Sequence, residues 1–132
     1  MIHIPDNFLT VKYVGARIPG IENQADLRLG ANCQVFAYEL LKKNGLYPPN
    51  LRSSELWDDI LHTKKVKNLR ALDLMLYNPD NESFGAHVGV YIGAEKIIHL
   101  SYQNQKPEII EHKLMSNNEK YRVFIGAKRV LK

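Results

Sequence analysis

The chain has 132 residues, of which 45% are hydrophobic and 24% are charged, and its formal net charge is +4. This composition predicts one domain, spanning residues 1–132, whose core forms without disulfides, and the dispersed basic residues argue against a nucleic-acid binder. No stretch approaches the ~20 apolar residues that span a bilayer, so no membrane span is expected. The first residues lack the pattern of a secretory signal, which favours a cytoplasmic location.

The first half of the chain predicts short helices joined by a long loop. Helix-start residues followed by apolar ones indicate a short helix over 5–14, and three glycines indicate a loop over 15–31. Asn32 is a plausible N-cap for a helix that begins at Cys33 and stops at Gly45. A second helix is expected over about 53–62, capped by Ser53 or Ser54, with a buried stripe formed by Leu56, Trp57, Ile60 and Leu61.

The second half changes to the period of β-strands. Leucines alternate over 72–76 before a turn at 78–81, and β-branched residues alternate over 88–92. A turn at 93–95 leads to another strand at 98–100, and two more are expected over 107–113 and 121–131. Helices followed by meandering strands predict an α+β domain, with the N-terminal helices packed on a mostly antiparallel sheet.

Cys33, the only cysteine, opens the first long helix. A helix start offers unpaired N–H groups and a partial positive charge, both of which favour a thiolate. We therefore expect the pKa of the Cys33 thiol to be lowered, as a nucleophile requires. The alternative is that Cys33 is a small buried apolar residue without reactivity.

His87 and His99 are candidates for the base that a cysteine nucleophile needs. They are twelve residues apart, which places them on one face of the predicted hairpin, and Gly89 leaves room between them. His87 would take the thiol proton while His99 fixes its tautomer. Two surface histidines on a half-exposed sheet, or an open zinc site with Cys33, are the alternatives; the usual close spacings of zinc ligands are absent.

Two segments around these histidines, GAHVGVYIG at 85–93 and IIHLS at 97–101, resemble the histidine segment of the NlpC-type cell-wall cysteine peptidases, which are papain-like hydrolases. Weaker similarities to the family are found at 13–15, 72–74 and 124–130. The resemblance implies a papain-like fold with Cys33 as nucleophile, His87 as base and His99 as the third member of a triad. It also implies an oxyanion role for Tyr13, and neither a metal nor another cofactor.

The residues beside the nucleophile depart from the pattern of that family. Asn32 and Gln34 stand where the family usually has an aspartate and a serine, and they are expected to shape the substrate pocket. A neutral Asn32 would bind a free substrate amine less well than a carboxylate does, which argues against the usual γ-D-glutamyl–diamino acid specificity.

The sequence thus predicts a cysteine hydrolase that cleaves an amide bond, most plausibly in a peptide or peptidoglycan fragment. Deamidation and acyl transfer at the same site are alternatives, and so is a non-catalytic interaction domain. The net positive charge and the loop residues Arg17 and Arg28 favour an acidic ligand.

Overall fold

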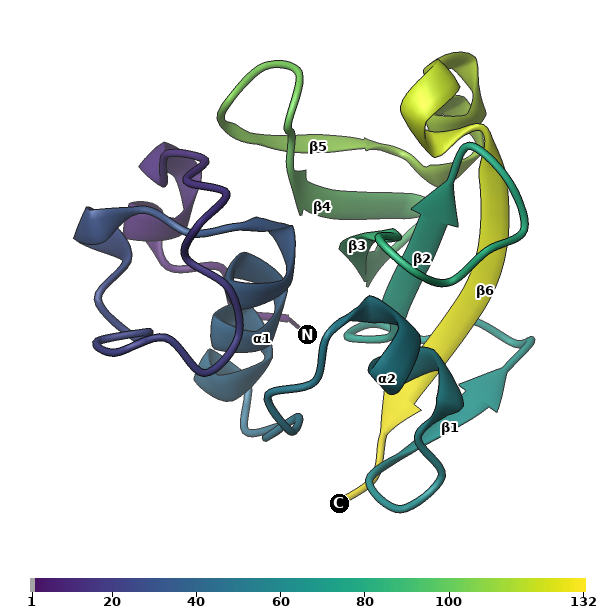
Figure 1. Ribbon diagram of the computed structural model, residues 1–132, viewed down its shortest axis with the longest axis horizontal. Helices are drawn as coiled ribbons and strands as arrows, with labels where there is room; N and C mark the ends of the chain where they lie inside the picture. Colours follow the sequence, from purple (N-terminus) through teal and green to yellow (C-terminus); the bar gives the residue numbers. More distant parts are fainter. Residues whose placement is uncertain (1) are drawn as a thin grey trace.

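The computed structural model describes residues 2–132 as helices packed on one six-stranded antiparallel sheet (Figure 1). The sheet order is β1-β6-β2-β3-β4-β5. The α-helices are α1 (Cys33–Lys43) and α2 (Ser53–Asp58), and the strands are β1 (Thr63–Val66), β2 (Leu74–Asn78), β3 (His87–Gly93), β4 (Lys96–Leu100), β5 (Pro107–Glu111) and β6 (Val123–Val130). Short 3-10 helices are η1 (Asp6–Thr10), η2 (Leu27–Leu29), η3 (His112–Asn117) and η4 (Glu119–Tyr121). The predicted α+β class is confirmed.

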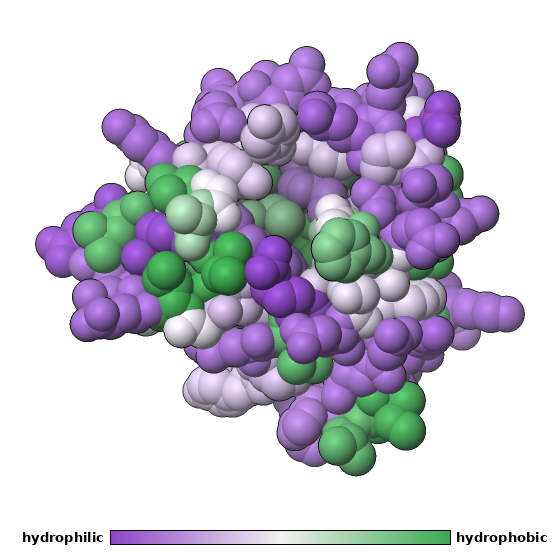
Figure 2. All heavy atoms as spheres, viewed as in Figure 1, coloured by the Kyte–Doolittle hydropathy of each residue, from purple (hydrophilic) through white to green (hydrophobic). Residues whose placement is uncertain are grey.

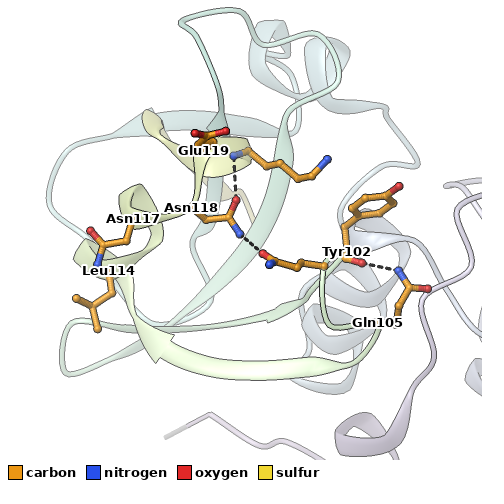
Figure 3. Close-up of a pocket in the computed structure, with 8 residues that line it drawn as sticks. Tyr102, Gln105, Leu114, Asn117, Asn118 and Glu119 are labelled. Atoms are coloured by element: carbon orange, nitrogen blue, oxygen red, sulfur yellow. Dashed lines mark hydrogen bonds between the residues drawn. The ribbon is translucent and has the colours of Figure 1, made fainter.

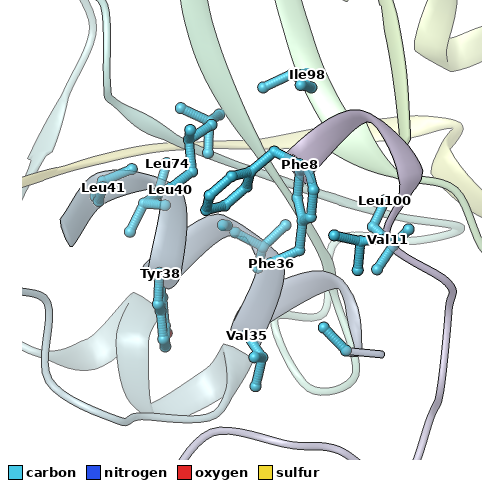
Figure 4. Packing of buried hydrophobic residues seen from close by; sticks show 14 of the residues in the cluster. Phe8, Val11, Val35, Phe36, Tyr38, Leu40, Leu41, Leu74, Ile98 and Leu100 are labelled. Atoms are coloured by element: carbon cyan, nitrogen blue, oxygen red, sulfur yellow. The ribbon is translucent and has the colours of Figure 1, made fainter. Parts of the chain in front are cut away.

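Helix α1 begins where the sequence predicts it, because Asn32 is its N-cap. The Asn32 Oδ1 atom accepts a hydrogen bond from the Val35 N–H at 2.8 Å. The helix packs against β3 and β4, and η1 closes this first core from the other side (Figure 4). Phe8 of η1 meets Phe36 of α1 edge to face, with ring centroids 5.6 Å apart. This packing fixes the start of α1 against one end of the sheet.

The opposite face of the sheet is covered too, which differs from the half-exposed sheet considered above. Its buried side chains form a second cluster with two residues of η3 and η4, Met115 and Tyr121. The strand residues of this cluster are Met75, Tyr77, Tyr91, Ile97 and Ala127. His87 and His99 lie on this second face, so they are interior residues.

The hairpin between β3 and β4 brings the two histidines to the same face through a bulge. Pairing runs Val90 to Ile98 but shifts by one residue before Gly93 pairs with Lys96. Ala94 and Glu95, both with positive φ, form a two-residue turn of the kind that suits a twisted hairpin. The loop is therefore shorter than the predicted three residues, and the bulge restores the predicted register.

Three details between α2 and the sheet differ from the sequence prediction. Helix α2 ends at Asp58, and Ile60 and Leu61 are 85% and 78% exposed, so these two do not belong to a buried stripe. The Asp59 carboxylate accepts hydrogen bonds from the His62 N–H at 3.0 Å and the Thr63 hydroxyl at 2.8 Å. This turn directs the chain into β1, a strand that the sequence analysis missed.

The face of the molecule in Figure 2 is mostly hydrophilic, and its hydrophobic side chains gather in separate groups. Within residues 2–132, no helix combines the length and the apolar character needed to cross a membrane.

Candidate active site

Cys33 lies at the first turn of α1 and opens onto a pocket of about 270 Å³. His87, at the start of β3, lines the same pocket, so the fold brings together the two residues that the sequence predicts as nucleophile and base. The Cys33 side chain is half-buried. The remaining lining residues are Tyr13, Asn78, Pro79, Gly85, Ala86, Tyr102, Lys120 and Tyr121.

The expected lowering of the thiol pKa is not found. Burial raises the pKa of the Cys33 thiol above its ordinary value, even though part of its surface reaches the pocket. The backbone N–H groups of Val88, Cys33 and Gln34 act in the opposite direction but do not outweigh burial. The helix start therefore does contribute, as predicted, but desolvation is the larger effect. Cys33 therefore rests as a neutral thiol, which would need a base in order to act as a nucleophile.

The two imidazoles are hydrogen-bonded to each other. His87 Nε2 and His99 Nδ1 are 2.8 Å apart, and the rings are nearly perpendicular. Gly89 lies directly across from His99, where an added Cβ would come within 3.3 Å of the His99 Cβ and 3.1 Å of the Ile97 Cδ1. The two histidines thus share one face of the hairpin as predicted, and Gly89 lies beside them and leaves room, as expected.

Both histidines are buried, His87 to 7% exposure and His99 to 2%. Tyr121 of η4 stacks on the His87 ring, with centroids 4.3 Å apart and an interplanar angle of 29°. Burial, followed by repulsion from His99, lowers the pKa of His87 well below its ordinary value. The pKa of His99 is lowered to about 4, mainly by burial. Both rings are therefore neutral at pH 7, and the interpretation as surface histidines does not hold.

The arrangement does not suit the zinc alternative. His87 Nε2 and His99 Nδ1 face each other across a hydrogen bond, so these two nitrogens cannot both point at a metal ion held by Cys33. Among residues 2–132, no group of three or more Cys, His, Asp or Glu side chains is arranged to hold a metal.

Tyr13 lies in the pocket beside Cys33, where the resemblance placed it. It forms an isolated bridge with Ala31, and its ring meets the Tyr102 ring edge to face at 5.2 Å. Burial raises the pKa of the Tyr13 hydroxyl, and a Cys33 thiolate would raise it further. A neutral phenol beside Cys33 is able to donate a hydrogen bond to an oxyanion in the pocket.

Asn32 and Gln34 do not line the pocket, so their predicted role in shaping it is not supported. The Asn32 side chain is engaged as the N-cap of α1. The Gln34 side chain is buried and donates hydrogen bonds to the Leu51 carbonyl at 3.1 Å and the Tyr38 hydroxyl at 3.3 Å. Gln34 therefore contributes only its backbone N–H to the surroundings of the thiol, together with the N–H groups of Cys33 and Val88.

Arg17 and Arg28, which were expected to favour an acidic ligand, have structural partners. Arg17 donates to backbone carbonyls of its own loop, and Arg28 pairs with Asp26 at 2.9 Å. Lys120 of η4 brings a positive charge to the pocket instead, with its Nζ atom 4.7 Å from the centre of the Tyr102 ring. Its position beyond β5 gave no signal in the sequence.

A larger groove of about 810 Å³ adjoins the pocket and shares Tyr102 and Lys120 with it (Figure 3). Side-chain amides dominate its other walls, which are Gln103, Gln105, Leu114, Asn117, Asn118 and Glu119. Asn118 organises one wall, because it donates to Gln103 Oε1 at 2.6 Å and accepts from the Lys120 N–H at 2.9 Å. A ligand that binds in the pocket can therefore extend into the groove and contact its polar, amide-rich walls.

No protein-family model and no curated protein matches the chain. Solved structures do match. One is an NlpC/P60 family protein from Bacillus cereus ATCC 10987, which is 26% identical with a TM-score of 0.66, over 95% of this chain and 37% of that one. In sequence and fold, the chain is therefore similar to NlpC/P60 family proteins.

Two further NlpC/P60 structures share the fold at lower identity. A Staphylococcus aureus protein described as similar to lipoprotein, NLP/P60 family, is 18% identical with a TM-score of 0.66, over 96% of this chain and 38% of that one. The NlpC/p60 domain of the peptidoglycan hydrolase SagA is 16% identical with a TM-score of 0.56, over 81% of this chain and 82% of that domain. The chain thus spans less than half the length of the two longer proteins.

Proposed function

We propose that this chain is a cysteine hydrolase that cleaves an amide bond, with Cys33 as nucleophile, His87 as general base and acid, and His99 as the residue that orients His87. The observation that carries the proposal is the buried His87–His99 hydrogen bond of 2.8 Å at a pocket that also exposes Cys33. Structural similarity to a domain of a peptidoglycan hydrolase supports a peptide of the peptidoglycan type as substrate.

The chemistry follows from the neutral resting state of the pair. As the Cys33 Sγ attacks the substrate carbonyl carbon, its proton passes to His87, and the carbonyl oxygen becomes an oxyanion. The Cys33 N–H and the Tyr13 hydroxyl are available as donors to that oxyanion. His87 then gives the proton to the leaving amine as the C–N bond breaks. Water, deprotonated by His87, releases the acyl group and restores the thiol.

The pocket and groove support a substrate with a carboxylate and amide groups. Lys120 can pair with a carboxylate at the rim of the pocket, and the amide-rich groove can exchange hydrogen bonds with a peptide beyond the scissile bond. Asn32 and Gln34 are engaged elsewhere, so nothing in the pocket specifically favours a glutamine side chain over a peptide bond.

The test is to incubate the protein with a panel of muropeptides and with glutamine-containing proteins, and to identify products by mass. We expect peptide-bond cleavage by the wild-type protein and none by Cys33→Ala, with Cys33→Ser nearly inactive. A gain of about one mass unit per modified glutamine would instead indicate a deamidase. Cleavage that persists in Cys33→Ala within tenfold of the wild type would contradict the proposal.

A further inference from the structure

A buried nitrogen beyond the proposed triad has no hydrogen-bond partner. His99 Nε2 is the only buried side-chain nitrogen or oxygen in the described residues 2–132 that lacks one. Its nearest acidic neighbour is Glu108 of β5, whose Oε2 atom is 3.5 Å away. Buried polar groups without partners are rare and costly, so this nitrogen calls for a functional explanation.

The sheet itself places Glu108 there. His99 and Glu108 are directly paired in the β4–β5 register, and the Glu108 side chain is only 25% exposed. Asn104, in the loop between these strands, donates its amide N–H to Glu108 Oε1, and its backbone N–H donates to the Ser101 hydroxyl at 3.0 Å. A small cavity of about 60 Å³ lies among His99, Glu108 and Tyr121 and leaves the carboxylate room to approach the ring.

The hydrogen bond between the His87 and His99 rings permits two tautomeric arrangements. His87 uses Nε2 toward His99, so Nδ1 is the ring nitrogen left to accept the proton of Cys33. For Nδ1 to be unprotonated, neutral His87 must carry its proton on Nε2 and donate it to His99 Nδ1. His99 must then carry its own proton on Nε2, which faces Glu108. The reverse arrangement protonates His87 Nδ1, abolishes the base and turns the lone pair of His99 Nε2 toward the carboxylate.

We propose that Glu108 is a positioning residue of the site: its carboxylate selects the tautomer in which His99 Nε2–H faces Glu108 and His87 Nδ1 can accept the Cys33 proton. The proposal rests on the proposed function and extends the proposed triad to Cys33, His87, His99 and Glu108. When His87 becomes an imidazolium during attack, the same carboxylate stabilises the added charge through His99. Three titratable groups face His99, namely His87 from β3, Glu108 from β5 and Tyr121 from η4.

The test compares Glu108→Gln, which keeps the shape of the side chain and removes its charge, with Glu111→Gln as the matched control. Glu111 lies on the same strand, but its side chain is 45% exposed and pairs with Lys113. Nitrogen NMR of the histidine rings reads the tautomers directly. We expect Nε2–H of His99 and of His87 in the wild type and in Glu111→Gln, and a mixture of tautomers in Glu108→Gln.

Kinetics provide a second readout. We expect Glu108→Gln to lower kcat/KM about tenfold and to move the acid limb of its pH profile to lower pH, because the imidazolium loses a stabilising charge. Glu108→Asp, which keeps the charge, should restore part of the rate. Unchanged tautomers in Glu108→Gln, or equal effects of Glu108→Gln and Glu111→Gln, would overturn the proposal. If the wild-type protein cleaves no substrate, the proposed function fails, whereas the NMR result still decides the role of Glu108.

Discussion

The proposed nucleophile and the proposed base are held by two differently built parts of the molecule. Cys33 lies at the end of a helix, is half-buried and faces a pocket. His87 and His99 lie within a sheet covered on both faces, hydrogen-bonded to each other and stacked under Tyr121. The difference shows that the two histidines proposed to transfer the proton are the more enclosed half of this site. The Cys33 thiol, by contrast, is positioned by the first turn of α1.

Substituting Cys33 or His87 should have the largest effects on activity, and the two variants should differ in stability. We expect Cys33→Ala and His87→Ala both to lose at least about a thousandfold in amide hydrolysis, because each removes an essential group. Cys33→Ala should unfold at nearly the wild-type urea concentration. His87→Ala should lose about 1–3 kcal/mol of stability, because it leaves a cavity under Tyr121 and leaves His99 Nδ1 without its hydrogen-bond partner.

A matched control for the base is His112→Ala. His112 is a half-buried histidine whose Nδ1 atom lies 3.2 Å from the Tyr77 hydroxyl, and it does not line the pocket that holds Cys33 and His87. It should lose stability and keep activity. Equal stability of Cys33→Ala and His87→Ala would contradict the contrast drawn between the two halves.

The reactivity of the thiol provides the next largest effect. Because burial raises the pKa of Cys33 and lowers that of His87, the pair rests as thiol and neutral imidazole. The rate of alkylation by iodoacetamide should therefore rise about tenfold per pH unit from pH 6 into the alkaline range. Mass spectrometry of the modified cysteine measures this rate. A fast rate that is independent of pH below 7 would indicate a thiolate–imidazolium pair, as the helix start alone suggested.

Crowding the histidine pair should have a smaller effect. Gly89→Ala adds a Cβ that meets Ile97 Cδ1 at 3.1 Å and His99 Cβ at 3.3 Å. We expect a loss of about 1 kcal/mol in stability and about tenfold in kcat/KM. Combining it with Ile97→Val removes only the contact to Ile97. If the double variant regains full activity, the displacement of His99 is not the cause of the loss.

The local parts of this picture could be predicted from the sequence. The N-cap at Asn32 and the shared face of His87 and His99 follow from residue type and period, which depend on neighbouring residues alone. The cover of the second face could not be predicted, because Tyr121 reaches His87 from a 3-10 helix distant in sequence. Glu108 meets His99 only through the register of β4 and β5, which sequence alternation does not fix.

The sequence analysis correctly placed Cys33 at a helix start but predicted a lowered thiol pKa, whereas the pKa is raised. The helix start supplies N–H groups, as predicted, but the burial that outweighs them depends on how the chain packs around the thiol. The same limitation applies to Asn32 and Gln34. Their positions flank the nucleophile, yet capping and a buried hydrogen bond to Leu51 take their side chains out of the pocket.

Acid should also destabilise the part of the site that holds the two histidines. The folded-state pKa of His99 is about 4, below its ordinary value of 6.5, and that of His87 is lowered too. Between these values the unfolded chain binds more protons than the folded one, so the free energy of unfolding should fall as pH drops below 6.5. The slope should reach at most about 1.4 kcal/mol per pH unit for each ring. Urea titrations at pH 7.5, 6 and 5 would measure it, and replacing both histidines with asparagine should flatten the dependence in this range. An equally steep dependence in that double variant would place the acid-sensitive groups elsewhere in the fold.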